Sequence, residues 1–107
     1  MELLPDEYMV RKNIMANLFK GIEGVGGLMH ITNQRIVFTP HALNVQTGPV
    51  DIWIEDIVQM GKRNTLGFVP NGMRIIVANG TEYRFVVWKR GELMALIDKV
   101  KRDNMKG

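Results

Sequence analysis

The sequence predicts a mainly β fold, a strongly bent antiparallel sheet of about seven strands followed by one C-terminal α-helix. Two hairpin patterns, around Asn33-Gln34 and Asn79-Gly80, indicate antiparallel strands. Beyond them, the apolar residues change from every second position to the spacing of a helix. Because a bent sheet leaves one end of its core open, the apolar stripe of that helix is expected to close it.

The first element, residues 8–20, fits two interpretations. Val10, Ile14 and Leu18 have helical spacing, but the same segment fits a long strand almost as well. A strand is favoured because the glycine-rich residues 21–27 that follow are typical of a hairpin loop. These glycines match neither Gly-x-Gly-x-x-Gly nor the Lys-terminated phosphate loop, so no phosphate-binding turn is expected.

The next two runs, 28–32 and 35–39, are expected to pair directly around Asn33-Gln34. One face of this hairpin is then apolar and carries Met29, Ile31, Ile36 and Phe38. The other face carries His30, Thr32, Arg35 and Val37.

Residues 50–54 also alternate, which predicts a strand. Val50, Ile52 and Ile54 point inward. Trp53 then lies on the outer face beside Asp51. A short bend at Glu55-Asp56 leads into a further strand over 57–62.

The last hairpin surrounds Asn79-Gly80. A two-residue turn would mix apolar and charged residues on both faces, whereas a three-residue turn over 78–80 leaves one apolar face. The pairs expected on that face are Met73 with Phe85 and Ile75 with Tyr83. The same register places Arg74 opposite Arg84 on the outer face, with Glu82 diagonal to Arg74.

The final segment, residues 91–103, is expected to be an amphipathic helix. Its apolar stripe consists of Leu93, Leu96, Ile97 and Val100. Cations lie late in the segment, where they favour the helix dipole: Lys99, Lys101, Arg102 and Lys106.

Length and composition fit one small globular domain. The 107 residues predict a single domain over 1–107, with its core at about 7–103. The N-terminus lacks the pattern of a signal peptide, and no apolar run is long enough to span a membrane. A soluble cytoplasmic protein is expected. The net charge of +3 is small, and no stacking aromatics accompany the basic residues, so nucleic acid is not expected as a partner.

The sequence carries no pattern for catalysis. Cysteine and serine are absent, and neither His30 nor His41 belongs to a metal-binding motif. The adjacent carboxylates Glu55 and Asp56 would point apart on a strand. We therefore expect no enzyme, no metal site and no cofactor.

Several of these segments resemble the GRAM-domain family. Residues 27–38 read Gly-Leu-Met-His-Ile-Thr-Asn-Gln-Arg-Ile-Val-Phe, and they resemble the family's core pattern of Gly, an aromatic-rich strand, Thr-Asn-x-Arg and an apolar strand ending in Phe. His30 stands where an aromatic residue is usual. Residues 52–57 and 79–85 resemble later elements of the family, and residues 16–21 with Gly26-Gly27 look like the start of compact bacterial members. The resemblance covers about residues 7–100.

The resemblance implies a pleckstrin-homology-like (PH-like) fold, a seven-stranded bent barrel capped by a helix. It also implies a non-catalytic module that binds lipids or proteins in membrane-associated processes. In lipid-binding members, basic residues around the first hairpin loop hold the head group. Here that loop has Lys20 and Glu23 and no second cation before Arg35, so no tight head-group site is expected there.

The first candidate site is the loop 61–70, where Lys62 and Arg63 stand beside apolar residues. These apolar residues are Leu66, Phe68 and Val69. One interpretation is contact with anionic lipid at the inner membrane face, with insertion of the apolar tip. The alternative is that the tip folds back onto the barrel and the cations are solvated.

Two further candidates lie on outer sheet faces. Arg74 and Arg84 would hold an anion between them, unless Glu82 or water offsets their repulsion. Trp53 is a candidate anchor for a protein partner or a homodimer. The alternative is that the N-terminal segment covers Trp53 through Leu3 or Leu4.

Overall fold

The structure is a computed structural model that describes residues 1–41, 48–65 and 69–106, without the side chains of residues 63–65 and 69–71. The seven strands are β1 (Met9–Lys20), β2 (Glu23–Thr32), β3 (Arg35–Pro40), β4 (Val50–Trp53), β5 (Ile57–Thr65), β6 (Val69–Val77) and β7 (Glu82–Val87). A 3-10 turn, η1 (Ile54–Asp56), follows β4, and α1 (Arg90–Met105) ends the chain. These elements confirm the predicted fold class.

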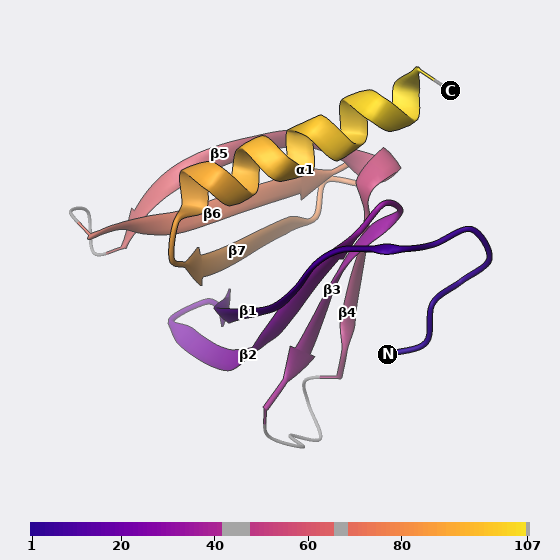
Figure 1. The fold of residues 1–107 in the computed structure, drawn as a ribbon. Coiled ribbons are helices and arrows are strands. Elements are labelled where there is room, and N and C mark those ends of the chain that lie inside the picture. Colours follow the sequence, from indigo (N-terminus) through magenta and orange to yellow (C-terminus); the bar gives the residue numbers. More distant parts are fainter. Residues whose placement is uncertain (42–47, 66–68, 107) are drawn as a thin grey trace.

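All seven strands belong to one antiparallel sheet in the order β4-β3-β2-β1-β7-β6-β5. Figure 1 shows the sheet bent into two halves, β1–β4 and β5–β7, with α1 running along β5 and β6. Within the described residues, no helix is long and apolar enough to cross a membrane.

Both predicted hairpin registers are confirmed. The upstream hairpin pairs Met29 with Phe38 and Ile31 with Ile36. The downstream hairpin pairs Met73 with Phe85, Arg74 with Arg84 and Ile75 with Tyr83. Gly80 has a φ of 92°, and its N–H donates to the Val77 carbonyl at 2.8 Å, as the three-residue turn requires.

The prediction of a hairpin loop over residues 21–27 is wrong for residues 23–27. Only Gly21 and Ile22 lie in the turn, and β2 begins at Glu23. The glycines serve close packing within the strand rather than flexibility. A Cβ on Gly27 would lie 2.3 Å from the Thr39 carbonyl oxygen and 2.8 Å from the Phe38 ring, so only glycine fits there.

Two other expectations are refined by the structure. The strand expected over 50–54 ends at Trp53, because Ile54 begins η1, although Ile52 and Ile54 are buried as predicted. Residues 8–20 form a strand, as favoured, with a bulge between Arg11 and Ile14. Asn13 has a φ of 59° within this bulge.

The core lies between the two halves of the sheet and is closed by α1. The rings of Phe38 and Phe85 meet across it, with centroids 5.7 Å apart. Of the predicted stripe of α1, Leu93, Ile97 and Val100 are buried in the same cluster, and Leu96 is partly buried against it.

Candidate functional site

Among the described residues, polar and exposed apolar side chains outside the core gather in three clusters and border three grooves. The most ordered is a buried polar cluster on the outer face of β2 and β3, which we call the Arg35 clasp: Glu7, Thr32 and Arg35. Glu7 has a fully buried side chain, and its carboxylate accepts hydrogen bonds from Arg35 Nε at 2.8 Å and Arg35 Nη2 at 3.0 Å. Thr32 Oγ1 and the Leu4 N–H donate to the same carboxylate, at 2.7 and 2.8 Å.

The charge distribution of the clasp is fixed by these bonds. The Arg35 guanidinium, which donates to the Glu7 carboxylate, lowers the pKa of Glu7 from 4.5 to about 2 against the opposing effect of burial. The hydrogen bond to Glu7 likewise raises the pKa of Arg35. Both groups are therefore ionised at neutral pH, and they form a buried ion pair.

The side chains of the turn Asn33-Gln34 form further hydrogen bonds to the N-terminal segment. Asn33 Nδ2 donates to the Asp6 carbonyl at 3.1 Å, and Asn33 Oδ1 accepts from the Tyr8 N–H at 2.7 Å. Gln34 Nε2 donates to the Pro5 carbonyl at 3.0 Å. The Thr-Asn-x-Arg pattern of residues 32–35 is thus explained by structure: it holds residues 2–8 against the sheet.

Trp53 lies beside the clasp and is 37% exposed. The Arg35 guanidinium lies 5.8 Å from the centroid of its ring. Leu3 and Leu4 are themselves 48% and 38% exposed. Arg35 thus contacts the Trp53 ring while the side chain stays exposed, and the role of Trp53 as a partner anchor stays a prediction.

The free part of Trp53 borders a groove of about 490 Å³ between η1 and the end of α1. Its other lining residues are Gln34, Ile54, Glu55, Lys101, Asn104 and Met105. Lys101 Nζ donates to the Ile54 carbonyl at 3.3 Å, and Asn104 Nδ2 donates to the Asn33 carbonyl at 2.7 Å. These bonds fix the end of α1 as one wall of the groove.

The Arg74 and Arg84 pair is brought together as predicted, but Glu82 lies with it. Glu82 Oε1 is 3.0 Å from Arg74 Nε, and Glu82 Oε2 is 3.9 Å from Arg84 Nε. One carboxylate between two guanidinium groups offsets much of their repulsion. Arg74 Nε is nevertheless buried without a hydrogen-bond partner among the described residues, and the anion site between these arginines stays a prediction.

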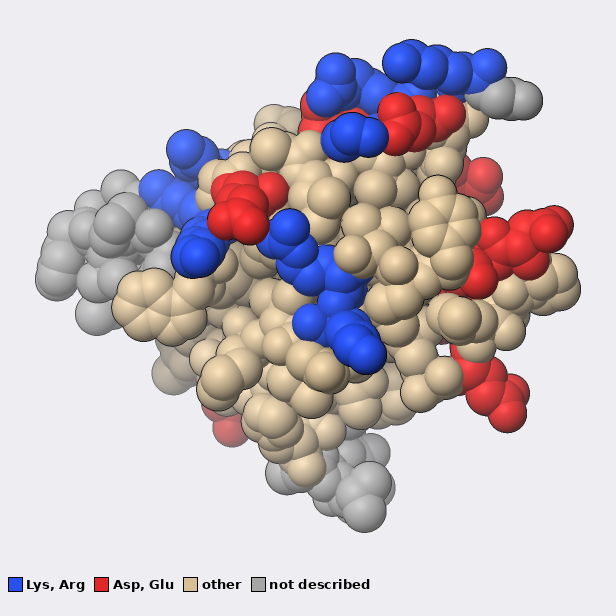
Figure 2. Space-filling view, in the orientation of Figure 1, with Lys and Arg blue, Asp and Glu red and all other residues tan. Residues whose placement is uncertain are grey.

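The structure brings the start of α1 to Lys62, and we call this region the basic end: Lys62, Trp88, Lys89 and Arg90. Lys62 Nζ lies 3.9 Å from the position that a Cβ on Gly91 would take. Trp88 is 83% exposed. Figure 2 shows basic side chains where the start of α1 lies beside β5 and β6.

The other residues predicted for the loop site cannot be placed at this end from the described part of the chain. Leu66 and Phe68 lie outside the described residues, and of Arg63 only the backbone, in β5, is described. Trp88 was missed by the sequence analysis. Its position directly after the last strand could have signalled exposure, because the chain leaves the sheet there.

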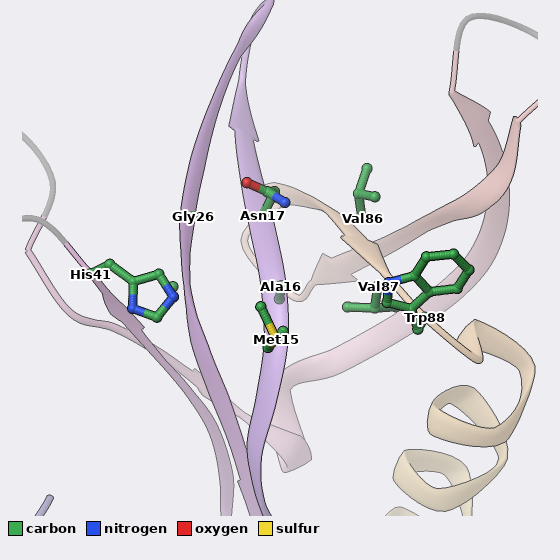
Figure 3. Close-up of a pocket in the computed structure, with 9 residues that line it drawn as sticks. Met15, Ala16, Asn17, Gly26, His41, Val86, Val87 and Trp88 are labelled. Atoms are coloured by element: carbon green, nitrogen blue, oxygen red, sulfur yellow. The ribbon is translucent and has the colours of Figure 1, made fainter.

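A second exposed apolar region crosses the outer face of β2, β1 and β7, and we call it the Trp88 groove. It has a volume of about 310 Å³ and is lined by Met15, Ala16, Asn17, Gly26, Gly27, His41, Val86, Val87 and Trp88. Figure 3 shows His41 and Trp88 on opposite sides of β1 and β2, with Met15 and Asn17 between them. Met15 is 70% exposed.

The third groove, of about 450 Å³, lies near the first hairpin. It is lined by Leu18, Phe19, Lys20, Pro49, Val50, Asp51, Thr81, Glu82 and Tyr83. Lys20 is the one cation among these residues and faces two carboxylates, Asp51 and Glu82. This charge balance is unsuited to a highly charged phosphate group.

Metal and histidine chemistry gains no support from the described part of the chain. There, no group of three or more His, Asp or Glu side chains is placed to hold a metal ion. His30 Nδ1 accepts a hydrogen bond from the Asn13 N–H at 3.1 Å, which gives it a structural role in the bulge. Burial lowers the pKa of His30, and the positive charges of the N-terminus and Lys12 lower it further.

Comparison with known proteins supports the fold. No family profile matches the chain, and no curated protein matches it. The N-terminal PH domain of Vps36 is similar in structure, with a TM-score of 0.73 at 13% identity over 99% of this chain and 87% of that chain. The C-terminal domain of an unknown protein from Leishmania infantum gives a TM-score of 0.76 at 12% identity, over 91% and 86%. The chain has a PH-like fold.

Proposed function

We propose that this chain is a non-catalytic binding module that makes a peripheral contact with anionic membrane lipid through its basic end. The observation that carries the proposal is that Lys62 of β5 reaches the start of α1, where its Nζ lies 3.9 Å from the Cβ position of Gly91, close in the chain to Lys89 and to the exposed Trp88. Its PH-like fold supports a binding role. The fold by itself does not select the ligand, so the choice rests on the surface.

The electrostatics of the basic end favour an anionic partner. Lys62 and Lys89 have exposed side chains, and both lie at the N-terminus of α1, where the helix dipole adds further positive potential. Arg90 donates to the Gly72 carbonyl at 3.1 Å, so it is held beside them. Glu92 lies in the first turn, but Arg11 pairs with it at 2.8 Å. Each cation near an anionic bilayer contributes about 1 kcal/mol.

Trp88 makes a bilayer a better match than a free anion. An indole favours the interface between head groups and acyl chains, where its ring is buried and its N–H stays hydrated. An exposed tryptophan beside lysines is therefore matched to a surface that offers both environments. None of the three grooves described above is lined by Lys62, Lys89 or Arg90, so we expect dependence on lipid charge rather than on one head group.

The experiment compares sedimentation with phosphatidylserine-containing and pure phosphatidylcholine vesicles. Replacing both Lys62 and Lys89 by Ala should remove about 2 kcal/mol of binding free energy, which weakens binding to the anionic vesicles about thirtyfold. The matched control replaces Lys99 and Lys106 by Ala, with the same change in net charge. From Gly91 to Lys106 the helix rises about 22 Å, which exceeds the screening length. Equal binding by the two double variants would refute the proposal.

We also propose that the chain is a member of the GRAM family, because the residues of the Arg35 clasp match a pattern of that family. Residues 32–35 match the family's Thr-Asn-x-Arg pattern, and Thr32, Asn33 and Arg35 each have a defined structural task. A pattern with such tasks is expected to persist among relatives whatever they bind. A set of relatives that lack an acidic partner for the arginine at this position would count against the assignment.

A second candidate function is self-association through Trp53. The groove of about 490 Å³ beside it favours this, because Met105 on its far wall is 77% exposed. Two apolar side chains across a shallow groove are suited to an isologous contact. Light scattering of the wild type and of Trp53→Ala tests it. A wild type that is monomeric at high concentration would exclude the homodimer.

A further inference from the structure

We propose that the Trp88 groove binds an uncharged, proline-rich peptide segment in the polyproline II conformation. This inference goes beyond the membrane contact and does not depend on it. It rests on the chemistry of the lining, on the position of the groove in the sheet, and on the exposure of its apolar side chains.

The described lining contains no acidic residue, lysine or arginine. A charged ligand would lose hydration in such a groove without gaining an ionic partner, and this excludes acidic and basic peptides as good matches. The occupant is therefore expected to be neutral.

The polar side chains of the lining are all able to donate hydrogen bonds. Asn17 offers its amide N–H groups, Trp88 its indole N–H and His41 a ring N–H. A proline-rich segment offers carbonyl acceptors and has few backbone N–H groups of its own. Donors on the protein and acceptors on the ligand are thus complementary.

The floor of the groove excludes the commonest alternative, the addition of a peptide strand. β1 is paired on both sides, with Asn17 opposite Gly26 of β2 and Val86 of β7. The backbone groups of the floor are engaged in the sheet and are not free for a new strand. A polyproline II helix needs no such groups, because it binds through side-chain contacts and a few carbonyls.

Exposed apolar side chains border an open floor in this groove. Trp88 and Met15 are 83% and 70% exposed, and Gly26 lacks a side chain between Asn17 and His41. Figure 3 shows the aromatic rings of His41 and Trp88 standing apart across this floor. Flat aromatic walls over an open floor suit a rigid, extended helix, which loses little entropy on binding.

The test follows backbone amides, the Asn17 amide and the Trp88 indole N–H by NMR during titration with a proline decamer. We expect saturable shifts at Met15, Asn17, Gly26 and Val86, with a downfield shift of the Trp88 indole N–H and none of the Trp53 indole. A Gly-Ser decamer of equal length should cause no such shifts. Asn17→Asp should weaken decamer binding about tenfold, because it replaces the donor by a charged acceptor.

The control variant is Asn79→Asp, which makes the same substitution in the β6–β7 turn. There the side-chain Oδ1 accepts from the Thr81 N–H at 2.9 Å, and Asp preserves that acceptor. Absence of shifts with the decamer, equal shifts with both decamers, or full binding by Asn17→Asp would overturn the proposal. So would concentration-dependent shifts without peptide, which would assign the groove to a second copy. Loss of the NMR signals of the groove residues when neutral vesicles are added would indicate that the Trp88 groove binds a bilayer instead.

Discussion

Replacing Glu7 by Gln should remove much of the stability that the Arg35 clasp provides. Glu7→Gln keeps the shape of the side chain but removes the charge that faces Arg35. Four donors converge on this carboxylate, at 2.7 to 3.0 Å. After the substitution, the new amide offers one oxygen acceptor but places an NH2 donor where the second carboxylate oxygen stood, and the Arg35 guanidinium otherwise keeps Asp51 at 3.3 Å and the Glu2 carbonyl at 2.9 Å. A largely buried cation is then poorly compensated.

The magnitude follows from the pKa of Glu7. A pKa of about 2 in the folded state, against 4.5 in the unfolded state, corresponds to about 3 kcal/mol. Because the pKa is lowered on folding, this stability is fully present above pH 4.5 and is lost as the pH falls from 4.5 towards 2. Loss of one partner from a buried pair costs a similar amount, about 3–5 kcal/mol.

The assay is urea unfolding of the wild type and of Glu7→Gln between pH 2 and 7. We expect the variant to lose about 3 kcal/mol at pH 7 and to show less acid dependence below pH 4.5. Glu55→Gln is the control, because Glu55 is exposed and should change stability by less than about 0.5 kcal/mol. If both variants lose the same small amount, or if the acid dependence of Glu7→Gln equals that of the wild type, the clasp does not stabilise the fold as argued.

Two further predictions concern the fold. Gly27→Ala should lower the free energy of unfolding by about 1–3 kcal/mol, because its Cβ would meet the Thr39 carbonyl oxygen at 2.3 Å. Gly26→Ala is the control and should be tolerated, because its Cβ would have no neighbour nearer than 3.4 Å. Equal denaturation midpoints for the two variants would contradict this packing. Protonation of His30 should destabilise the protein as the pH falls through 6.5, because its pKa is lowered on folding and its Nδ1 must accept from Asn13. Thermal melts of the wild type and His30→Gln between pH 7.5 and 5 test this, and parallel curves would rule it out.

Local patterns were sufficient for the fold. The registers of the β2–β3 and β6–β7 hairpins followed from neighbouring residues, as in the pairing of Arg74 with Arg84, because a slip by one residue would have exposed the apolar face. The helix stripe was equally local. The continuation of β2 through Gly24 to Gly27 was missed, because the need for glycine there comes from Thr39 and Phe38 on the neighbouring strand.

The surfaces depended on contacts between distant residues, and the sequence could not place them. Lys62 lies at the start of α1 only because this helix begins beside β5. Glu7 and Arg35 are 28 residues apart, and a single acidic residue near the N-terminus gives no signal of its partner. The Arg74 and Arg84 pair could be predicted from the hairpin register alone, because both arginines and their partner Glu82 belong to the same hairpin.

The most direct test of the membrane contact is the quenching of single tryptophans by brominated anionic vesicles. Trp53→Phe leaves Trp88 as the sole tryptophan, and Trp88→Phe leaves Trp53. The basic end should insert, so the fluorescence of Trp88 should be quenched by the brominated chains, while that of Trp53 should not. Quenching of Trp53 in preference to Trp88, or of neither residue, would contradict the proposed orientation and the function inferred from it.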